Sequence, residues 1–190
     1  MVQGNDGLSR FAVDAKASLF TVQAFAAGMI AVVAHSPKFA IRAVVGIISF
    51  VPDTMQKASV HLTIDLGSLE IMDEVSSAER REIERVMFDE VLEKSIYPRA
   101  EFKSSHVNAS KAAENTFRVN ILGDLTFHGI TRGVGLDSQV VAGVDSLRAQ
   151  GSFTLMQSDY GLKIASIAGG TLKLKDELKF AYFLVGRRKD

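Results

Sequence analysis

The sequence predicts a mainly β fold built from many short antiparallel strands, with one amphipathic helix. Three observations support this prediction. Polar and apolar residues alternate with a period of two in several segments, turn-forming residues separate these segments, and a single segment shows helical spacing. Strict alternation places one face of a strand in a core and the other in water. Many short strands at this spacing are typical of a sandwich or a barrel, and alternation by itself does not separate the two.

The first strands fall within the first fifty residues, and we expect them at 11–14, 18–25 and 39–50. The apolar run from Phe20 to Val33 has about the length of a signal-peptide core, but acidic residues precede it and Gln23 interrupts it. It is also shorter than the roughly 20 residues that span a bilayer. We therefore interpret the run as two core strands and expect a cytoplasmic protein. If the run is a signal peptide instead, the location is periplasmic.

The clearest alternation in the first half runs over seven residues, from Val60 to Leu66, after a turn signal at Pro52-Asp53. A different pattern follows at 76–92, where Ile83, Val86, Met87 and Val91 recur at helical spacing between charged residues. The start of this segment, Ser76-Ser-Ala-Glu79, fits a capping box, and Pro98 prevents continuation of the helix. We expect one amphipathic helix near residues 76–94, covering one end of the fold with its charged face in solvent.

The second half of the chain returns to strand patterns as far as the C-terminus. We expect strands at 100–106, 117–121, 125–130, 134–141, 151–155 and 179–185. Turn signals separate them at Asn115, Gly123-Asp124, Gly143, Asp159-Tyr-Gly161 and Gly169-Gly170. No internal repeat or linker interrupts the sequence, so one domain over residues 1–190 is enough to account for it.

Composition excludes several classes of function. The 190 residues carry 22 basic and 22 acidic side chains, and a net charge of zero argues against nucleic acid as the main partner. Cysteine is absent from the sequence, so disulfides, thiolate metal sites and thiol nucleophiles are excluded. Apolar residues make up 47% of the chain, which indicates a globular domain rather than an integral membrane protein.

The histidines give no catalytic or metal-binding signature. There are four, His35, His61, His106 and His128, and none has the spacing of a zinc motif. We expect His61 to face solvent from the polar side of its strand and His128 to hold a turn. No strand–turn–helix nucleophile elbow is recognisable. The sequence therefore predicts no metal, no cofactor and no catalytic residues.

Six motifs in chain order resemble one known family. They are Phe11-Ala-Val-Asp14 with Ser18-Leu-Phe20, Gly46-Ile-Ile-Ser-Phe50-Val-Pro52, Ala58-Ser-Val-His-Leu-Thr-Ile-Asp65-Leu-Gly-Ser68-Leu69, Tyr97-Pro-Arg-Ala-Glu-Phe102-Lys-Ser-Ser105, Gly123-Asp-Leu-Thr-Phe-His-Gly129-Ile-Thr-Arg132, and Gln157-Ser-Asp-Tyr-Gly-Leu162. Together they resemble the YceI-like family of polyisoprenoid-binding proteins, and they cover nearly the whole chain. The fifth is similar to the most specific motif of that family.

The resemblance implies a single antiparallel, lipocalin-like β-barrel of about eight strands. It also implies a bacterial protein, a homodimer, and non-catalytic binding or transport of a hydrophobic long-chain ligand, such as a polyisoprenoid, an isoprenoid quinone or a fatty amide-like lipid. A barrel of this size holds either side chains or one small ligand. The side chains that we expect to line the ligand site are Phe20, Val22, Phe39, Ile41, Leu62, Ile64, Phe102, Phe127 and Phe153. We expect Tyr97 and Tyr160 to mark its mouth and bind a head group.

Two alternatives remain from the residues themselves. The inward-facing side chains form an ordinary core in most barrels, so the interior would be filled and the role structural or regulatory. The other alternative is an enzyme that acts on a small lipophile in the same pocket, with His128 or His35 as general base.

Overall fold

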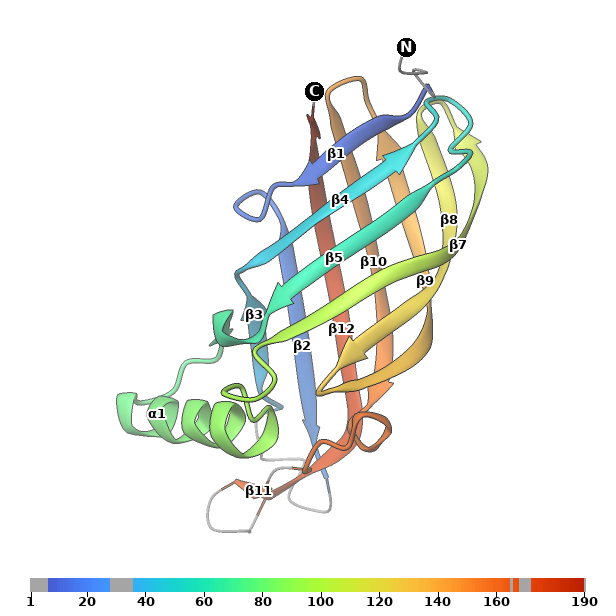
Figure 1. The fold of residues 1–190 in the computed structure, drawn as a ribbon. Helices are drawn as coiled ribbons and strands as arrows, with labels where there is room; N and C mark the ends of the chain where they lie inside the picture. The colour runs from blue at the N-terminus through green and yellow to red at the C-terminus, as the bar shows by residue number, and fades with distance from the viewer. Residues whose placement is uncertain (1–6, 28–35, 165, 168–171, 190) are drawn as a thin grey trace.

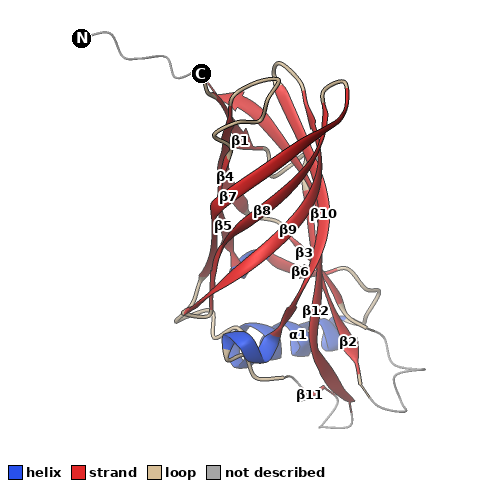
Figure 2. Ribbon diagram, turned by 90° about the vertical axis from the view of Figure 1, so that its right-hand side faces the viewer, coloured by secondary structure: helices blue, strands red, loops and turns tan. Residues whose placement is uncertain are grey.

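The computed structural model describes residues 7–27, 36–164, 166–167 and 172–189, and strands dominate it. The strands form an elongated barrel, and the helix lies across one end (Figures 1 and 2). The strands are β1 (Ser9–Val13), β2 (Leu19–Ala26), β3 (Lys38–Ile41), β4 (Val44–Phe50), β5 (Ser59–Asp65), β6 (Leu69–Ile71), β7 (Arg99–Ala113), β8 (Thr116–Phe127), β9 (Ile130–Ala142), β10 (Ser146–Met156), β11 (Ser166–Ile167) and β12 (Leu172–Lys189). Helix α1 (Ser77–Arg85) continues into a π-helical segment (Val86–Val91).

Eight antiparallel strands close the barrel in the order β1-β4-β5-β7-β8-β9-β10-β12, because β1 pairs with both β4 and β12. Strand β12 is long enough to hold two partners along one edge. Its residues Gly186 to Lys189 pair with β1, and its residues Leu174 to Phe183 pair with β2. Strands β3 and β6 extend the sheet beyond β2. The predicted mainly β, barrel-shaped fold with a single helix is confirmed.

Alternation builds the core as expected, and β8 shows it most clearly. Phe117, Val119, Ile121, Leu125 and Phe127 are all buried, whereas most residues between them are exposed. Because successive side chains of a strand point to opposite faces, these five side chains share the barrel interior. The same period governs the other long strands and turns their apolar residues toward one central space.

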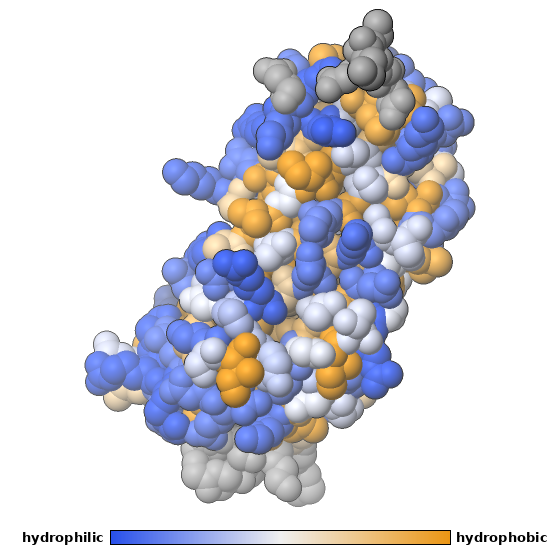
Figure 3. Space-filling view, in the orientation of Figure 1, coloured by the Kyte–Doolittle hydropathy of each residue, from blue (hydrophilic) through white to orange (hydrophobic). Residues whose placement is uncertain are grey.

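The helix begins as the sequence predicts. The Ser76 hydroxyl accepts a hydrogen bond from the Glu79 amide, and the Glu79 carboxylate accepts one from the Ser76 amide. Helix α1 itself has no buried residue, whereas the π-helical segment buries Met87. The surface at the lower left of the view, where α1 lies, is mostly hydrophilic (Figure 3). No helix in the described part of the chain is long and apolar enough to cross a bilayer.

Three predictions about strand boundaries are wrong, and one of them is the expected strand at 125–130, because β8 ends at Phe127. The expected strand at 39–50 is two strands, because the chain bends between Ile41 and Val44, where the Ser68 hydroxyl accepts a hydrogen bond from the Ala43 amide. The expected turn at Gly123-Asp124 lies in the middle of β8.

The hairpin turn after β8 comes instead at His128-Gly129, where both residues have positive φ, 50° and 73°. That is the backbone of a tight hairpin turn, so His128 holds a turn as expected. The predicted Gly169-Gly170 turn lies outside the described residues.

Candidate functional site

The barrel interior encloses a cavity of about 160 Å³, which we call the inner cavity. Thirty of the described residues line it, and they come from β2, β3, β4, β5, β7, β8, β9, β10 and β12 and from the loops beside them. None of these thirty is charged, and only Thr21, Ser138 and Tyr182 carry a hydroxyl group. The remainder are aliphatic and phenylalanine side chains and the thioether of Met55. The chemistry of the wall therefore favours an apolar occupant.

Seven of the predicted lining residues lie on the inner cavity: Phe20, Ile41, Leu62, Ile64, Phe102, Phe127 and Phe153. They come from six different strands, and the barrel brings them together because each occupies an inward position of its strand. Phe153 stacks on Phe180 of the neighbouring strand β12, with ring centres 5.0 Å apart. Such aromatic pairs fix the shape of the wall.

A second cavity of about 280 Å³, the outer cavity, lies between the π-helical segment and strands β2, β3 and β12. The other two predicted residues, Val22 and Phe39, lie on it. Ile41, Leu66, Phe127 and Phe180 line both cavities, so the two spaces adjoin and these four side chains form the partition.

The rim of the outer cavity is polar. Arg85 forms ion pairs with Glu82 and Glu90, with nitrogen–oxygen distances of 2.8 and 2.7 Å, and all three side chains line the cavity. The hydrogen bond from Arg85 holds the pKa of the Glu82 carboxyl below its usual range. The three side chains are about half exposed, so salt screens their attraction and either ion pair opens at modest cost. The outer cavity thus has an apolar floor and a charged rim that rearranges easily.

The two predicted tyrosines lie on neither cavity. Tyr160 is almost fully buried against Phe127, with ring centres 5.4 Å apart, and its hydroxyl has no hydrogen-bond partner among the described residues. Burial raises the pKa of this tyrosine. Tyr97 packs on the ring of His128 at 4.3 Å between centres. Both tyrosines support the end of the barrel rather than the surface of a cavity.

His128 joins the helical segment to the barrel. Its Nδ1 lies 3.1 Å from the carbonyl oxygen of Tyr160, and its Nε2 lies 3.0 Å from the Glu93 carboxylate. Both ring nitrogens therefore lie within hydrogen-bonding distance of an oxygen atom. The side chain is only 10% exposed and lines neither cavity. Through these contacts, His128 links the β8–β9 hairpin turn to Glu93, which follows the helical segment.

His61 also lines neither cavity. His61 is half exposed and lies 2.5 Å from the Glu101 carboxylate on the outside of the barrel, as expected from its polar strand face. His35 lies outside the described residues. Among the residues that the structure describes, no three His, Asp or Glu side chains gather in a way that could hold a metal ion.

Sequence reasoning missed the hydroxyl groups on the inner cavity. Ser138 lies between Leu136 and Val140 in the inward phase of β9, and Tyr182 lies between Phe180 and Leu184 in the inward phase of β12. A polar residue in phase with apolar neighbours two positions away was therefore the available signal. The outer cavity gave no such signal, because it depends on how the helix packs against β2 and β3.

An eight-stranded antiparallel barrel around an apolar interior defines a lipocalin-like β-barrel. The family follows from the sequence, since a model of the YceI-like domain matches residues 11–184. The chain belongs to the YceI-like family. No protein with curated annotation matches it significantly.

Solved structures support the same fold. BcnA of Burkholderia cenocepacia matches with a TM-score of 0.69 and 21% identity, over 91% of this chain and 98% of that one. A polyisoprenoid-binding domain from Saccharophagus degradans, implicated in plant cell wall breakdown, matches with a TM-score of 0.69 and 16% identity, over 96% and 99%. A YceI protein of Campylobacter jejuni matches with a TM-score of 0.57 and 14% identity, over 80% and 84%. At these identities the likeness shows the fold.

Proposed function

We propose that this protein binds a hydrophobic long-chain lipid inside its barrel, for transport or sequestration, and performs no chemistry on it. The observation that carries the proposal is the inner cavity, whose described lining residues include no charged side chain. Polyisoprenoids, isoprenoid quinones and fatty amide-like lipids are the ligand classes that fit such a wall. The polyisoprenoid-binding description of the Saccharophagus degradans relative supports the same class.

Burial of the hydrocarbon chain supplies the affinity. Each methylene group that leaves water for an apolar site contributes roughly 0.8 kcal/mol. A chain that places about ten methylene groups against such side chains therefore gains on the order of 8 kcal/mol before the costs of association. No ion pair between ligand and protein is required, which agrees with the uncharged wall.

The two adjoining cavities suggest the path of the lipid's hydrocarbon chain through the protein. A ligand longer than the inner cavity extends past the partition formed by Ile41, Leu66, Phe127 and Phe180 into the outer cavity. The floor there is apolar, and the charged rim of Glu82, Arg85 and Glu90 meets the solvent. We propose that the lipid enters beside the helical segment, which moves to admit it.

The absence of chemistry is part of the proposal. His128 and His35 were the histidines considered as a general base, and His35 lies outside the described residues. The Tyr160 carbonyl and Glu93 engage both ring nitrogens of His128 away from the cavities. The hydroxyl groups on the inner cavity have no imidazole or carboxylate partner among its described lining residues. A general base needs such an oriented partner to activate a nucleophile.

A substitution that fills the inner cavity tests the proposal. Ala149 lines the cavity from β10, opposite Val140 on β9 and Leu184 on β12. We expect Ala149→Phe to occupy the ligand space and abolish the fluorescence rise of Nile red titrated into delipidated protein. Gln150→Phe places the same side chain on the outer face of β10 and should bind like the parent. Unchanged Nile red binding by folded Ala149→Phe would contradict the proposal.

The quaternary structure and location also remain proposals. We propose a homodimer, as the family resemblance implies, and light scattering coupled to size-exclusion chromatography tests it through the molar mass. We propose a cytoplasmic location, which fractionation of the source cells tests directly. Recovery of the protein in the periplasmic fraction would support the signal-peptide interpretation of the apolar run at 20–33 instead.

A further inference from the structure

Two hydroxyl groups form a pair on the otherwise apolar wall of the inner cavity. The Ser138 Oγ on β9 and the Tyr182 Oη on β12 lie 2.5 Å apart, and both residues line the cavity. Ser138 is 7% exposed, and burial raises the pKa of Tyr182, so the phenol is neutral over the ordinary pH range. The pair is therefore a fixed, uncharged polar point inside a hydrophobic space.

The intervening strand leaves room for this pair. Gly151 of β10 pairs with Ser138 on one side and with Tyr182 on the other. A Cβ atom at Gly151 would collide with the Tyr182 hydroxyl and with the Asp137 carbonyl oxygen. The missing side chain thus lets the phenol reach across β10 to Ser138, while the Phe20 ring packs on the Tyr182 ring at 6.5 Å between centres.

The pair has hydrogen-bonding capacity left over. Each hydroxyl can donate one hydrogen bond and accept two. One donated hydrogen joins the two oxygens, and the described residues provide no acceptor for the other. Whichever hydroxyl donates within the pair, its partner keeps one free O–H. An unused donor in an apolar interior is unfavourable, so a ligand group that accepts this hydrogen bond gains affinity.

The composition of the inner-cavity wall indicates that the ligand's polar group is uncharged. The described lining residues include no cation, so a phosphate or carboxylate buried here would be left without a counter-charge. A neutral acceptor avoids that cost. The pair also lies on the inner side of the partition, because Phe180 lines both cavities whereas Ser138 and Tyr182 line only the inner one.

We propose that Ser138 and Tyr182 anchor the neutral polar group of the bound lipid, such as a ketone, amide, ester or alcohol, by donating one hydrogen bond to it. The hydrocarbon chain then runs past Phe180 toward the outer cavity. This inference rests on the proposed lipid-binding function and narrows it to uncharged lipids that carry a hydrogen-bond acceptor.

Two probes of equal chain length test the anchor: oleamide, which has an amide carbonyl, and cis-9-octadecene, which has none. Their affinities are measured by displacement of Nile red from the full, delipidated chain. We expect Tyr182→Phe to weaken oleamide binding severalfold, and Ser138→Ala combined with Tyr182→Phe to weaken it about tenfold, with octadecene affinity changed less than twofold. Tyr160→Phe removes a buried hydroxyl that lines neither cavity and should change neither affinity.

The outcomes separate the anchor from the general function. Equal weakening of both probes would mean that the pair only braces β9 against β12, and unchanged oleamide binding in the double variant would mean that it holds nothing. Either result overturns the anchor and leaves lipid binding intact. If the parent protein binds neither probe, the proposed function and the anchor both fail. Far-ultraviolet circular dichroism checks that each variant is folded.

Discussion

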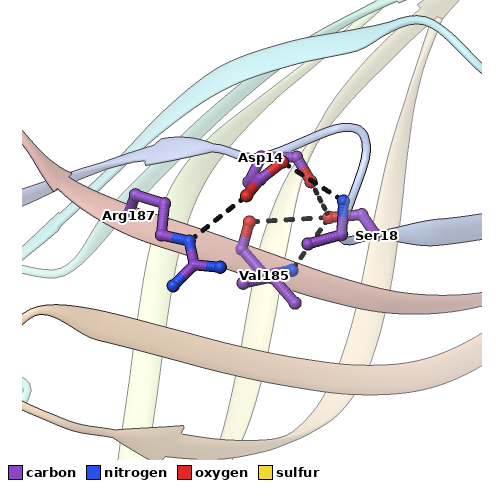
Figure 4. Close-up of polar contacts among 5 residues, drawn as sticks. Asp14, Ser18, Val185 and Arg187 are labelled. Carbon is purple, nitrogen blue, oxygen red and sulfur yellow. Dashed lines mark hydrogen bonds and ion pairs between the residues drawn. The ribbon is translucent and has the colours of Figure 1, made fainter.

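The hydroxyl of Ser18 accepts a hydrogen bond from the backbone amide of Val185, at 2.9 Å (Figure 4). Val185 lies on β12 between the residues that pair with β1 and those that pair with β2. The Val185 carbonyl accepts the Asp14 amide at 2.8 Å, so the corner satisfies both backbone groups of this residue. Ser68 and Ser104 play the same part elsewhere, because their hydroxyls accept the amides of Ala43 and Val60. Serines that recur in the motifs resembling the family thus accept backbone amides at the β1–β2 corner, at the bend before β4 and between β5 and β7.

We predict that Ser18→Ala destabilises the barrel by about 1–3 kcal/mol, because it leaves the buried Val185 amide without an acceptor. Urea unfolding followed by circular dichroism measures the change. Ser110→Ala is the matched control, since the Ser110 hydroxyl is exposed on β7 and makes only a 3.5 Å contact with the Arg118 carbonyl. A loss for Ser18→Ala no larger than for the control would show that the corner does not depend on this bond.

The same corner predicts an acid-dependent contribution to stability. The amide of Ala17 and then the Arg187 side chain lower the pKa of the Asp14 carboxyl. A carboxyl whose pKa is lower in the folded chain than in the unfolded chain stabilises the fold above its unfolded pKa, and that contribution is lost as the pH falls through the folded pKa. We therefore expect Asp14→Asn to lower the melting temperature at pH 7, with the difference fading below about pH 4.

Thermal melts from pH 7 to pH 2.5 provide the comparison. Asp124→Asn, an exposed position in the middle of β8, serves as the control for loss of a carboxylate. The prediction is wrong if the difference between the parent and Asp14→Asn stays constant over this range or grows as the pH falls.

The contact between His128 and Glu93 predicts how fast lipid exchanges. It is the bond that ties the end of the helical segment to the β8–β9 turn, so its loss should loosen the cover of the outer cavity. We expect His128→Asn to speed Nile red dissociation severalfold in stopped-flow measurements. Asparagine tolerates the positive φ of 50° at this position but is too short to keep the contact with Glu93.

His61→Asn is the matched control for this experiment. It removes a second histidine–glutamate pair of the described residues, with Glu101, which lies on the outside of the barrel wall away from both cavities. If the two variants change the dissociation rate equally, the helical segment does not gate the site.

Removing the Tyr160 hydroxyl should raise the stability of the fold or leave it unchanged, in contrast to Ser18→Ala. Its hydroxyl is buried without a partner among the described residues, and burial of an unpaired polar group is unfavourable. Tyr160→Phe keeps the packing against Phe127 and removes that penalty, so we expect a stability equal to the parent's or up to about 1 kcal/mol higher. A destabilisation of more than about 1 kcal/mol would show that the hydroxyl is bonded in solution.

The sequence predicts most of the inward-facing residues because alternation along a strand is a local feature. The barrel itself was implied by the family resemblance, since alternation does not separate a barrel from a sandwich. Leu62 and Phe127 occur in segments where apolar and polar residues alternate. A strand with that alternation places its apolar side chains on one face, and in the barrel this face lines the interior. The bend at Ala43 depends instead on Ser68, a residue distant in sequence, so the local pattern of 39–50 shows an unbroken strand. Gly123 resembles a turn residue, although β8 continues through it.

The candidate site is only partly predictable for the same reason. Val22 and Phe39 were expected on one ligand site with the other lining residues, yet they line the outer cavity, which exists only once the helix packs over β2 and β3. Tyr160 lies in the glycine-containing turn Asp159-Tyr-Gly161 and is a reasonable choice for a mouth residue, but packing against Phe127 buries it. The pairing of Ser138 with Tyr182 requires three strands in register with Gly151 between them.

Lipid binding inside the barrel is tested first by native mass spectrometry of the protein purified from its host, followed by solvent extraction and identification of the released molecules. We expect one neutral long-chain lipid per chain, with an acceptor such as a carbonyl or alcohol group. An empty protein that also refuses added oleamide and other long-chain lipids would contradict it, and the apolar interior would then be an ordinary core.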